Sequence, residues 1–134
     1  MLDVLLAALS LPLLAMTSTA CADPAITSAI ATQVGDNGAL TTYDVAVRVK
    51  NAGSMAEPSS LLQSVQVFQD ATKVDQMGAP PLSAGRAATV HYRFTRSSGA
   101  HARSTHLRFK LVLTDPHRAT TDCSVANDTF RLDV

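Results

Sequence analysis

Apolar and polar side chains alternate along most of this chain, with the period of two that is typical of a half-buried β-strand. The clearest example begins at Tyr43, where Tyr43, Val45, Val47 and Val49 alternate with Asp44, Ala46, Arg48 and Lys50. No segment after residue 22 has a convincing helical period. The predicted strands span 25–33, 42–51, 62–69, 87–95, 106–114 and 128–134, with a shorter one near 73–77.

Turn-forming residues separate the alternating segments, as expected when strands are joined by short connections. They occur at 35–38, 51–53, 80–81, 97–99 and 115–116. Seven short strands between residues 23 and 134 predict an all-β fold: a seven-strand antiparallel immunoglobulin-like β-sandwich. The third, sixth and seventh strands are expected to share one sheet, and the strand that holds Arg93 is expected in the other.

The alternation also predicts which side chains lie between the two sheets. The predicted core contains Tyr43, Val45, Val47, Val49, Val90, Tyr92, Phe94, Leu107, Phe109, Leu111, Phe130 and Leu132. The side chains expected to point outward are Arg48, Lys50, Arg93, Arg108 and Lys110. Ile26 and Ile30 are assigned to one face of the weaker first strand.

The N-terminal segment differs from the rest, because residues 4–16 are apolar and carry no charge. Thirteen residues are too few to span a bilayer but match the apolar region of a signal peptide. We therefore expect a signal peptide over 1–20, with an alternative end at 22, followed by the sandwich domain over 23–134. No Lys or Arg precedes the apolar run, which is atypical of a signal peptide. The alternative is a buried N-terminal helix. Export would make the protein periplasmic or secreted, with no transmembrane segment left in the mature chain.

Composition narrows the classes of partner. The 11 basic and 11 acidic residues give a net charge of zero, so no overall positive charge attracts the chain to nucleic acid, and we expect no nucleic-acid partner. With two Tyr, four Phe and no Trp, too few rings remain to fill a core and also line a sugar-binding groove. Two cysteines are too few for a disulfide-dense miniprotein or a four-cysteine zinc site.

Short motifs in the chain resemble those of a known family, the bacterial cell-adhesion-related domain, CARDB. Val45-x-Val47-x-Val49-x-Asn51-x-Gly53 resembles its second strand, and 65–70 its third. The segment 82–85 leading into 89–92 resembles its L-x-x-G turn before the fifth strand, and Asp115-Pro116 followed by 127–129 resembles its ending. The resemblance covers residues 23–134, and it rests on the order and spacing of the motifs together.

The resemblance implies an immunoglobulin-like or fibronectin-like sandwich outside the cytoplasm, with a binding or spacing role that the family name links to adhesion. One departure concerns the acid-containing run that the family carries before its last strand. Here the stretch 122–128 has Val125 in place of an acid and an inserted Cys123. An acid-dependent role of that loop, such as calcium binding, is therefore not carried over to this chain.

Candidate catalytic and metal-binding residues are sparse. His101 and His106 lie five residues apart in a Ser-, Ala- and Arg-rich loop without a nearby acid or cysteine, so we expect solvated side chains and no metal site. Ser, His and Asp residues are present, but no G-x-S-x-G motif indicates the nucleophile of a hydrolytic triad. Cys123 and His117 could form a thiol–imidazole pair, but a disulfide or an inert thiol explains Cys123 better. We therefore expect no catalytic residue and no cofactor.

The distribution of charge suggests one binding face. No acid occurs between Asp75 and Asp115, whereas six of the eleven bases do. Such a surface suits an anionic polysaccharide, a lipid head group or an acidic partner, although the alternative is an ordinary solvated face. The candidate partner-binding face consists of Phe68, Arg108, Lys110 and Val112, with the alternative that Phe68 lies under a loop.

The two cysteines are expected to form a disulfide, Cys21–Cys123. In a seven-strand antiparallel sandwich the chain reverses six times, so the start of the first strand and the loop before the last strand lie at the same end. Cleavage after Ala20 keeps Cys21, whereas cleavage after Ala22 removes it and leaves Cys123 single. A third alternative is a lipoprotein acylated at Cys21, although Ser18 stands where such proteins usually have Leu.

Together these features predict a secreted or periplasmic, non-enzymatic binding or structural accessory module, with adhesion as the role that the resemblance suggests. Its partner would be a protein or an envelope polysaccharide. The alternative is a small envelope lipoprotein anchored through Cys21.

Overall fold

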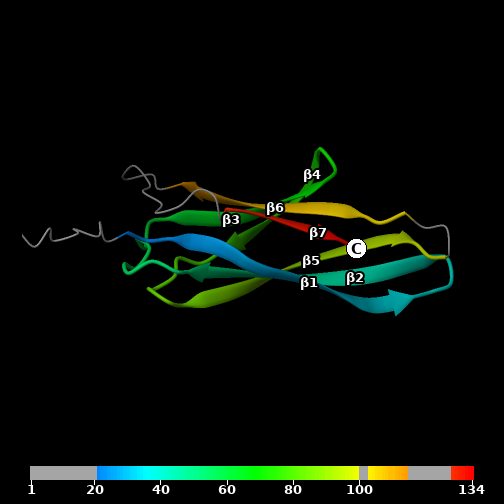
Figure 1. The fold of residues 1–134 in the computed structure, drawn as a ribbon, viewed down its shortest axis with the longest axis horizontal. Helices are drawn as coiled ribbons and strands as arrows, with labels where there is room; N and C mark the ends of the chain where they lie inside the picture. The colour runs from blue at the N-terminus through cyan, green and yellow to red at the C-terminus, as the bar shows by residue number, and fades with distance from the viewer. Residues whose placement is uncertain (1–20, 100–102, 115–127) are drawn as a thin grey trace, which may run out of the picture.

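Two antiparallel sheets pack face to face in the computed structural model, which describes residues 21–99, 103–114 and 128–134 (Figure 1). The three-stranded sheet has the order β1 (Pro24–Asp36), β2 (Leu40–Asn51) and β5 (Ala87–Ser97). The four-stranded sheet has the order β4 (Thr72–Ala79), β3 (Leu62–Gln69), β6 (His106–Thr114) and β7 (Thr129–Asp133). The predicted antiparallel seven-strand sandwich is therefore confirmed.

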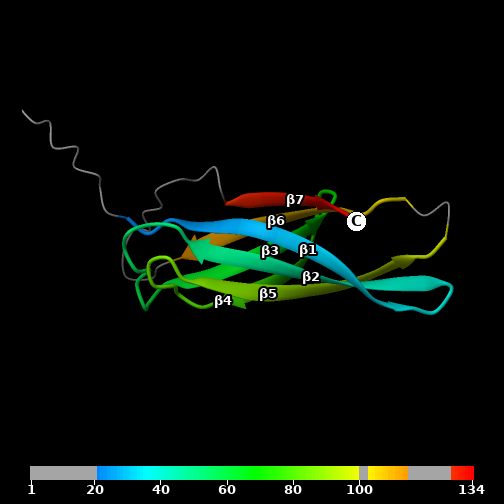
Figure 2. The same ribbon diagram turned by 60° about the horizontal axis from the view of Figure 1, so that its bottom comes forward.

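The predicted division of strands between the sheets is also confirmed. The strands β3, β6 and β7 share the four-stranded sheet, and β5, which carries Arg93, lies in the other. The short fourth strand β4 pairs with β3, whereas the constant-type immunoglobulin domain places its fourth strand in the other sheet. At one open side of the sandwich β1 approaches β7 (Figure 2).

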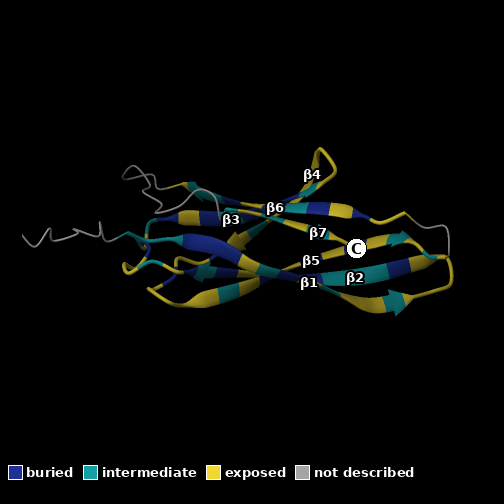
Figure 3. Ribbon diagram, in the orientation of Figure 1, coloured by how far each residue is buried: buried dark blue, intermediate teal, exposed yellow. Residues whose placement is uncertain are grey.

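The core lies between the sheets and follows the alternation of the sequence (Figure 3). Val45, Val47 and Val49 of β2 are fully buried, and so is Phe109 of β6. Among the aromatic residues, the Phe94 ring stacks on those of Tyr43 and Tyr92, with centroids 5.4 and 5.8 Å apart. The remaining predicted core residues are buried or packed against this cluster: Val90, Leu107, Leu111, Phe130 and Leu132.

One predicted assignment in the first strand is wrong. Ile26 is 5% exposed, as a core residue should be, but Ile30 is 62% exposed. The pairing of β1 with β2 shifts register between Ile26 and Ser28, so one extra residue enters β1 at this point. A bulge of this kind reverses which residues face inward. Ala29 consequently replaces Ile30 on the buried face.

The family-like motifs meet in space at one end of the sandwich. The side-chain amide of the fully buried Asn51 donates to the carbonyl oxygens of Met55 and Leu82 at 2.7 and 3.1 Å. The backbone N–H of Gly85, which has a φ of 75°, donates to the carbonyl oxygen of Asn51 at 2.8 Å. The L-x-x-G turn therefore closes on the Asn that ends β2, and Gly85 supplies the positive φ.

Two predictions concern residues outside the described part of the chain. The expected signal peptide over 1–20 lies there, as does Cys123, so the Cys21–Cys123 bond stays a prediction. The described strands do satisfy its topological premise. β1 begins at the end of the sandwich where β6 stops and β7 starts (Figure 1).

Candidate functional site

The outer surface of the four-stranded sheet carries four basic side chains, which we term the cationic face: Lys73, Arg108, Lys110 and Arg131. Cross-strand register aligns three of them. Lys73 of β4 is opposite Phe68 of β3, Phe68 is opposite Arg108 of β6, and Arg108 is opposite Arg131 of β7. A single row therefore crosses all four strands, and Lys110 lies two residues farther along β6.

An aromatic ring sits within this row. The guanidinium carbon of Arg108 lies 4.6 Å from the centroid of the Phe68 ring, within the range of a cation–π contact. Phe68 is of intermediate exposure, and this contact covers it with Arg108. This contact holds the guanidinium over the ring, so Arg108 is positioned on the outer surface of the sheet.

The cationic face has almost no acidic counterpart. Of the outward positions on β3, β4, β6 and β7 that the structure describes, only Asp133 carries an acid. The ion pairs found among the described residues involve Asp44 on the opposite sheet, and Asp133 with His106. Lys73 donates instead to the neutral Gln76 side chain at 2.7 Å. The face thus keeps an excess of positive charge.

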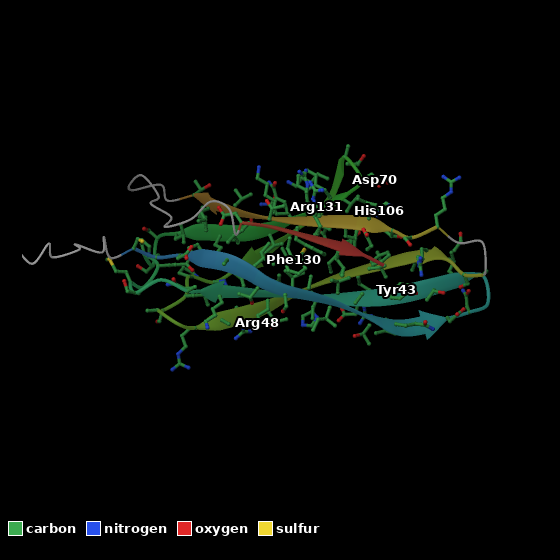
Figure 4. All side chains as sticks on the ribbon, in the orientation of Figure 1. Tyr43, Arg48, Asp70, His106, Phe130 and Arg131 are labelled. Atoms are coloured by element: carbon green, nitrogen blue, oxygen red, sulfur yellow. The ribbon has the colours of Figure 1, made fainter. Side chains whose placement is uncertain are left out.

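A His–Asp pair borders one side of the row, two residues along β6 and β7 from Arg108 and Arg131. His106 Nδ1 lies 2.7 Å from an Asp133 carboxylate oxygen, and this hydrogen bond, together with the charge of Asp133, raises the pKa of His106 above its ordinary 6.5. A shallow hollow of about 550 Å³ opens here, lined by Asp70, Ala71, His106, Leu107, Arg108, Arg131 and Asp133. Figure 4 shows Arg131, His106 and Asp70 on one side of the sandwich and Arg48 on the other.

The predicted binding-face residues come together, and two further residues join them. The four predicted residues occupy outward positions: Phe68 on β3, and Arg108, Lys110 and Val112 on β6. Lys73 and Arg131 were missed as members of this site. The alternation around Phe130 and Leu132 already assigns Arg131 an outward position, but its place opposite Arg108 depends on the register of β7. The sequence does not determine how β4 pairs with β3, so it could not place Lys73 opposite Phe68.

The other bases of the acid-poor interval lie elsewhere. Arg93 and the exposed His91 project from β5 toward Asp44, at 3.9 and 3.0 Å. Arg96 has a structural role, because its guanidinium donates to the Tyr43 hydroxyl at 3.0 Å and to the Val134 carbonyl oxygen at 2.9 Å and so links two segments of the chain. It also donates to the carbonyl oxygen of Arg103 at 3.2 Å.

Potential metal ligands do not cluster in the described part of the chain. Within 21–99, 103–114 and 128–134, no three His, Cys, Asp or Glu side chains gather in a way that could hold a metal ion. His101, His117 and Cys123 lie outside those ranges. The described part of the chain also contains no helix of the length and apolarity needed to cross a membrane.

Comparison with known structures identifies the fold. The CARDB domain of a Pyrococcus furiosus protein, crystallised in complex with di-metal ions, superposes with a TM-score of 0.62 at 17% identity, covering 88% of this chain and 96% of that domain. Its solution structure gives a TM-score of 0.58 at 18% identity, covering 85% and 94%. This chain therefore has the fold of a CARDB domain, in agreement with the resemblance of its motifs.

A second protein shares the same architecture. The 272–376 domain of a protein described as a cell surface protein of Methanosarcina acetivorans superposes with a TM-score of 0.59 at 18% identity, covering 85% of this chain and 90% of that domain. No protein-family model matches the sequence, and comparison with curated proteins finds no match. At these identities the likeness defines the fold, and the function has to be argued from this chain's own residues.

Proposed function

We propose that this protein is a non-enzymatic binding module that acts outside the cytoplasm and contacts its partner through the outer surface of the four-stranded sheet. Phe68, Arg108, Lys110 and Val112 form the centre of the contact. The observation that carries the proposal is the contact of the Arg108 guanidinium with the Phe68 ring beside three further bases, with no acid opposite any of them in the register. An arginine already held over an aromatic ring presents its donors to a partner with little further loss of side-chain entropy.

The extracytoplasmic location rests on the uncharged N-terminal segment, and the cell surface protein with the same fold supports it. A sandwich whose sequence motifs serve turns and packing, as Asn51 and Gly85 do here, is suited to a spacing or binding role. The alternative is a small envelope lipoprotein anchored through an acylated Cys21, in which the same face would serve envelope assembly.

Mass spectrometry of the N-terminus of the exported protein separates these two forms. A free N-terminus at Cys21 or Asp23 indicates a soluble module, whereas an acylated Cys21 indicates the anchored one. An intact N-terminal segment would contradict export by a cleaved signal peptide.

The binding face is tested by affinity capture from envelope extract with the double variant Phe68→Ala/Arg108→Ala. We expect the variant to lose the partners that the wild-type protein captures. The control is Arg48→Ala/Arg93→Ala on the opposite sheet, which should retain them. Equal capture by all three proteins would overturn the assignment of the face.

A further inference from the structure

The spacing of the cationic face carries information about the ligand. Adjacent strands are about 4.8 Å apart, so the row from Lys73 through Phe68 and Arg108 to Arg131 spans about 14 Å. Lys110 is displaced from Arg108 by two residues along β6, or about 7 Å. Four bases therefore occupy an area that one extended oligomer with several negative groups would cover.

The positions of Arg108 and Arg131 favour an anion between them. Like charges directly opposite each other on antiparallel strands destabilise a sheet, and these two are register partners on β6 and β7. The described ion pairs leave both without an acidic partner. A carboxylate bound across the pair would relieve the repulsion and accept paired N–H donors from guanidinium groups.

A second row of side chains, beside the cationic row, indicates which uncharged groups the ligand carries. Gln76 of β4, Gln66 of β3, Lys110 of β6 and Thr129 of β7 are aligned in register beside the cationic row. Gln76 also donates to the hydroxyl of Ser64 at 2.7 Å, so this area is a continuous surface of amide and hydroxyl groups. These groups donate and accept hydrogen bonds as sugar hydroxyls do. The acids Asp70 and Asp133 lie on the side of the cationic row away from Lys110, around the hollow that Arg108 and Arg131 also line.

The flat surface favours a polysaccharide over an acidic peptide. Extended peptides are usually bound at a sheet edge, through backbone hydrogen bonds, or in a groove. On the central strands β3 and β6 the backbone pairs on both sides, so the face itself offers only side chains. Phe68, the one ring in the row, is covered by Arg108, which disfavours the stacking of a neutral sugar.

We propose that the cationic face binds an acidic polysaccharide whose carboxylates pair with Arg108, Arg131 and Lys110 while its hydroxyls contact the adjoining amide and hydroxyl side chains. This inference rests on the proposed function and specifies its ligand. Lys73 extends the site at the β4 edge. Asp70 and Asp133, on the side of the row away from Lys110, limit how far a polyanion can extend over the hollow.

The probe is a uronic-acid oligomer, oligogalacturonate, with its methyl-esterified form as a neutral match. Calorimetry and backbone NMR of the full exported protein should show binding of the acid form, with shifts in outward residues of β3, β6 and β7, and no binding of the ester. Arg108→Gln/Arg131→Gln should weaken binding by roughly tenfold or more, the effect of losing a charge-assisted hydrogen bond. Arg48→Gln/Lys50→Gln removes equal charge from the other sheet and should leave the affinity unchanged.

Three outcomes would overturn this inference. They are equal loss of affinity in both double variants, equal binding of the ester, and binding of poly-glutamate as tight as that of oligogalacturonate, which would make the ligand an acidic peptide or any polyanion. Circular dichroism verifies that each variant is folded, and Lys73→Gln/Lys110→Gln gives a second test that leaves the Arg108–Phe68 contact intact.

If capture from envelope extract still depends on Phe68 and Arg108 while the oligomer fails to bind, only the ligand assignment is wrong. If capture is also unaffected, the proposed binding face is wrong as well.

Discussion

The side-chain amide of Asn51 donates to the carbonyl oxygen of Leu82, 31 residues away, and so joins the end of β2 to the connection that precedes β5. The oxygen of the same side chain accepts hydrogen bonds from the backbone N–H groups of Asp23 and Gly53, both at 3.0 Å. One fully buried residue thus holds three segments of the chain together. The segment before β1, the loop after β2 and the turn before β5 all depend on it.

Replacement of Asn51 by Ala should therefore be costly, because buried donors and acceptors lose their partners at several sites at once. We expect a loss of about 3–5 kcal/mol in the free energy of unfolding, measured by urea denaturation. The matched control is Asn37→Ala in the exposed β1–β2 turn, whose side chain accepts from the N–H groups of Ala39 and Leu40. Water can replace those bonds, so the control should lose about 1 kcal/mol or less. Similar losses in both variants would contradict the role assigned to Asn51.

Gly53 is predicted to be irreplaceable for a steric reason. A Cβ atom at this position would overlap the carbonyl oxygen of Cys21 and lie 2.6 Å from the backbone nitrogen of Asp23. Gly53→Ala should displace the segment before β1, which would appear as a lower melting temperature and as faster amide hydrogen exchange at the start of β1. Gly78→Ala is the control, because nothing lies within 4 Å of its Cβ position and its φ is not positive. A fully stable Gly53→Ala variant would show that this close approach is absent in solution.

Phe109 is fully buried between the sheets, so its truncation should leave a cavity. We expect Phe109→Ala to lower the free energy of unfolding by about 3–5 kcal/mol in chemical denaturation. Phe68→Ala, on the outer face, should cost about 1 kcal/mol, since the ring loses only its partial burial and its contact with Arg108. If Phe68→Ala were the more damaging change, the assignment of inner and outer faces on β3 and β6 would be wrong.

The His106–Asp133 pair predicts a pH dependence. The pKa of His106 is raised in the folded protein, so the pair contributes its full stabilisation below pH 6.5. This stabilisation is lost as the pH rises through the folded-state pKa. An NMR titration of the imidazole should give a pKa above 6.5, and Asp133→Asn should bring it back toward that value. An unchanged titration in Asp133→Asn would show that the pair does not form in solution.

The predicted Cys21–Cys123 disulfide should be detectable by thiol titration of the exported, denatured protein with and without reductant. We expect no reactive thiol before reduction and two afterwards, as befits an oxidising compartment. In the chain-entropy model a bond that closes about 100 residues stabilises the fold by roughly 4–5 kcal/mol. A monomer that begins at Asp23 and shows one reactive thiol without reductant would refute the bond.

Alternation along the chain was enough to predict the number of strands, most of their bounds and most of the core, although the predicted core omitted the buried Val65, Val67, Ala79 and Leu82. The reason is that a period of two is a local property, and a strand covered on one face must repeat it. The inner position of Val47 and Phe109 and the outer position of Arg108 follow from this local pattern alone. Ile30 was misassigned because a single extra residue near Thr27 reverses the alternation, and no local pattern marked that bulge.

The register between strands could not be predicted in this way, and the candidate site depends on it. Lys73, Phe68, Arg108 and Arg131 come from four strands separated by connections of different length, and their alignment follows from which residues pair. The same holds for Asn51, whose bond to Leu82 requires the turn before β5 to fold back on the end of β2. Alternation specifies which face of each strand is buried, but packing between distant strands decides which side chains become neighbours.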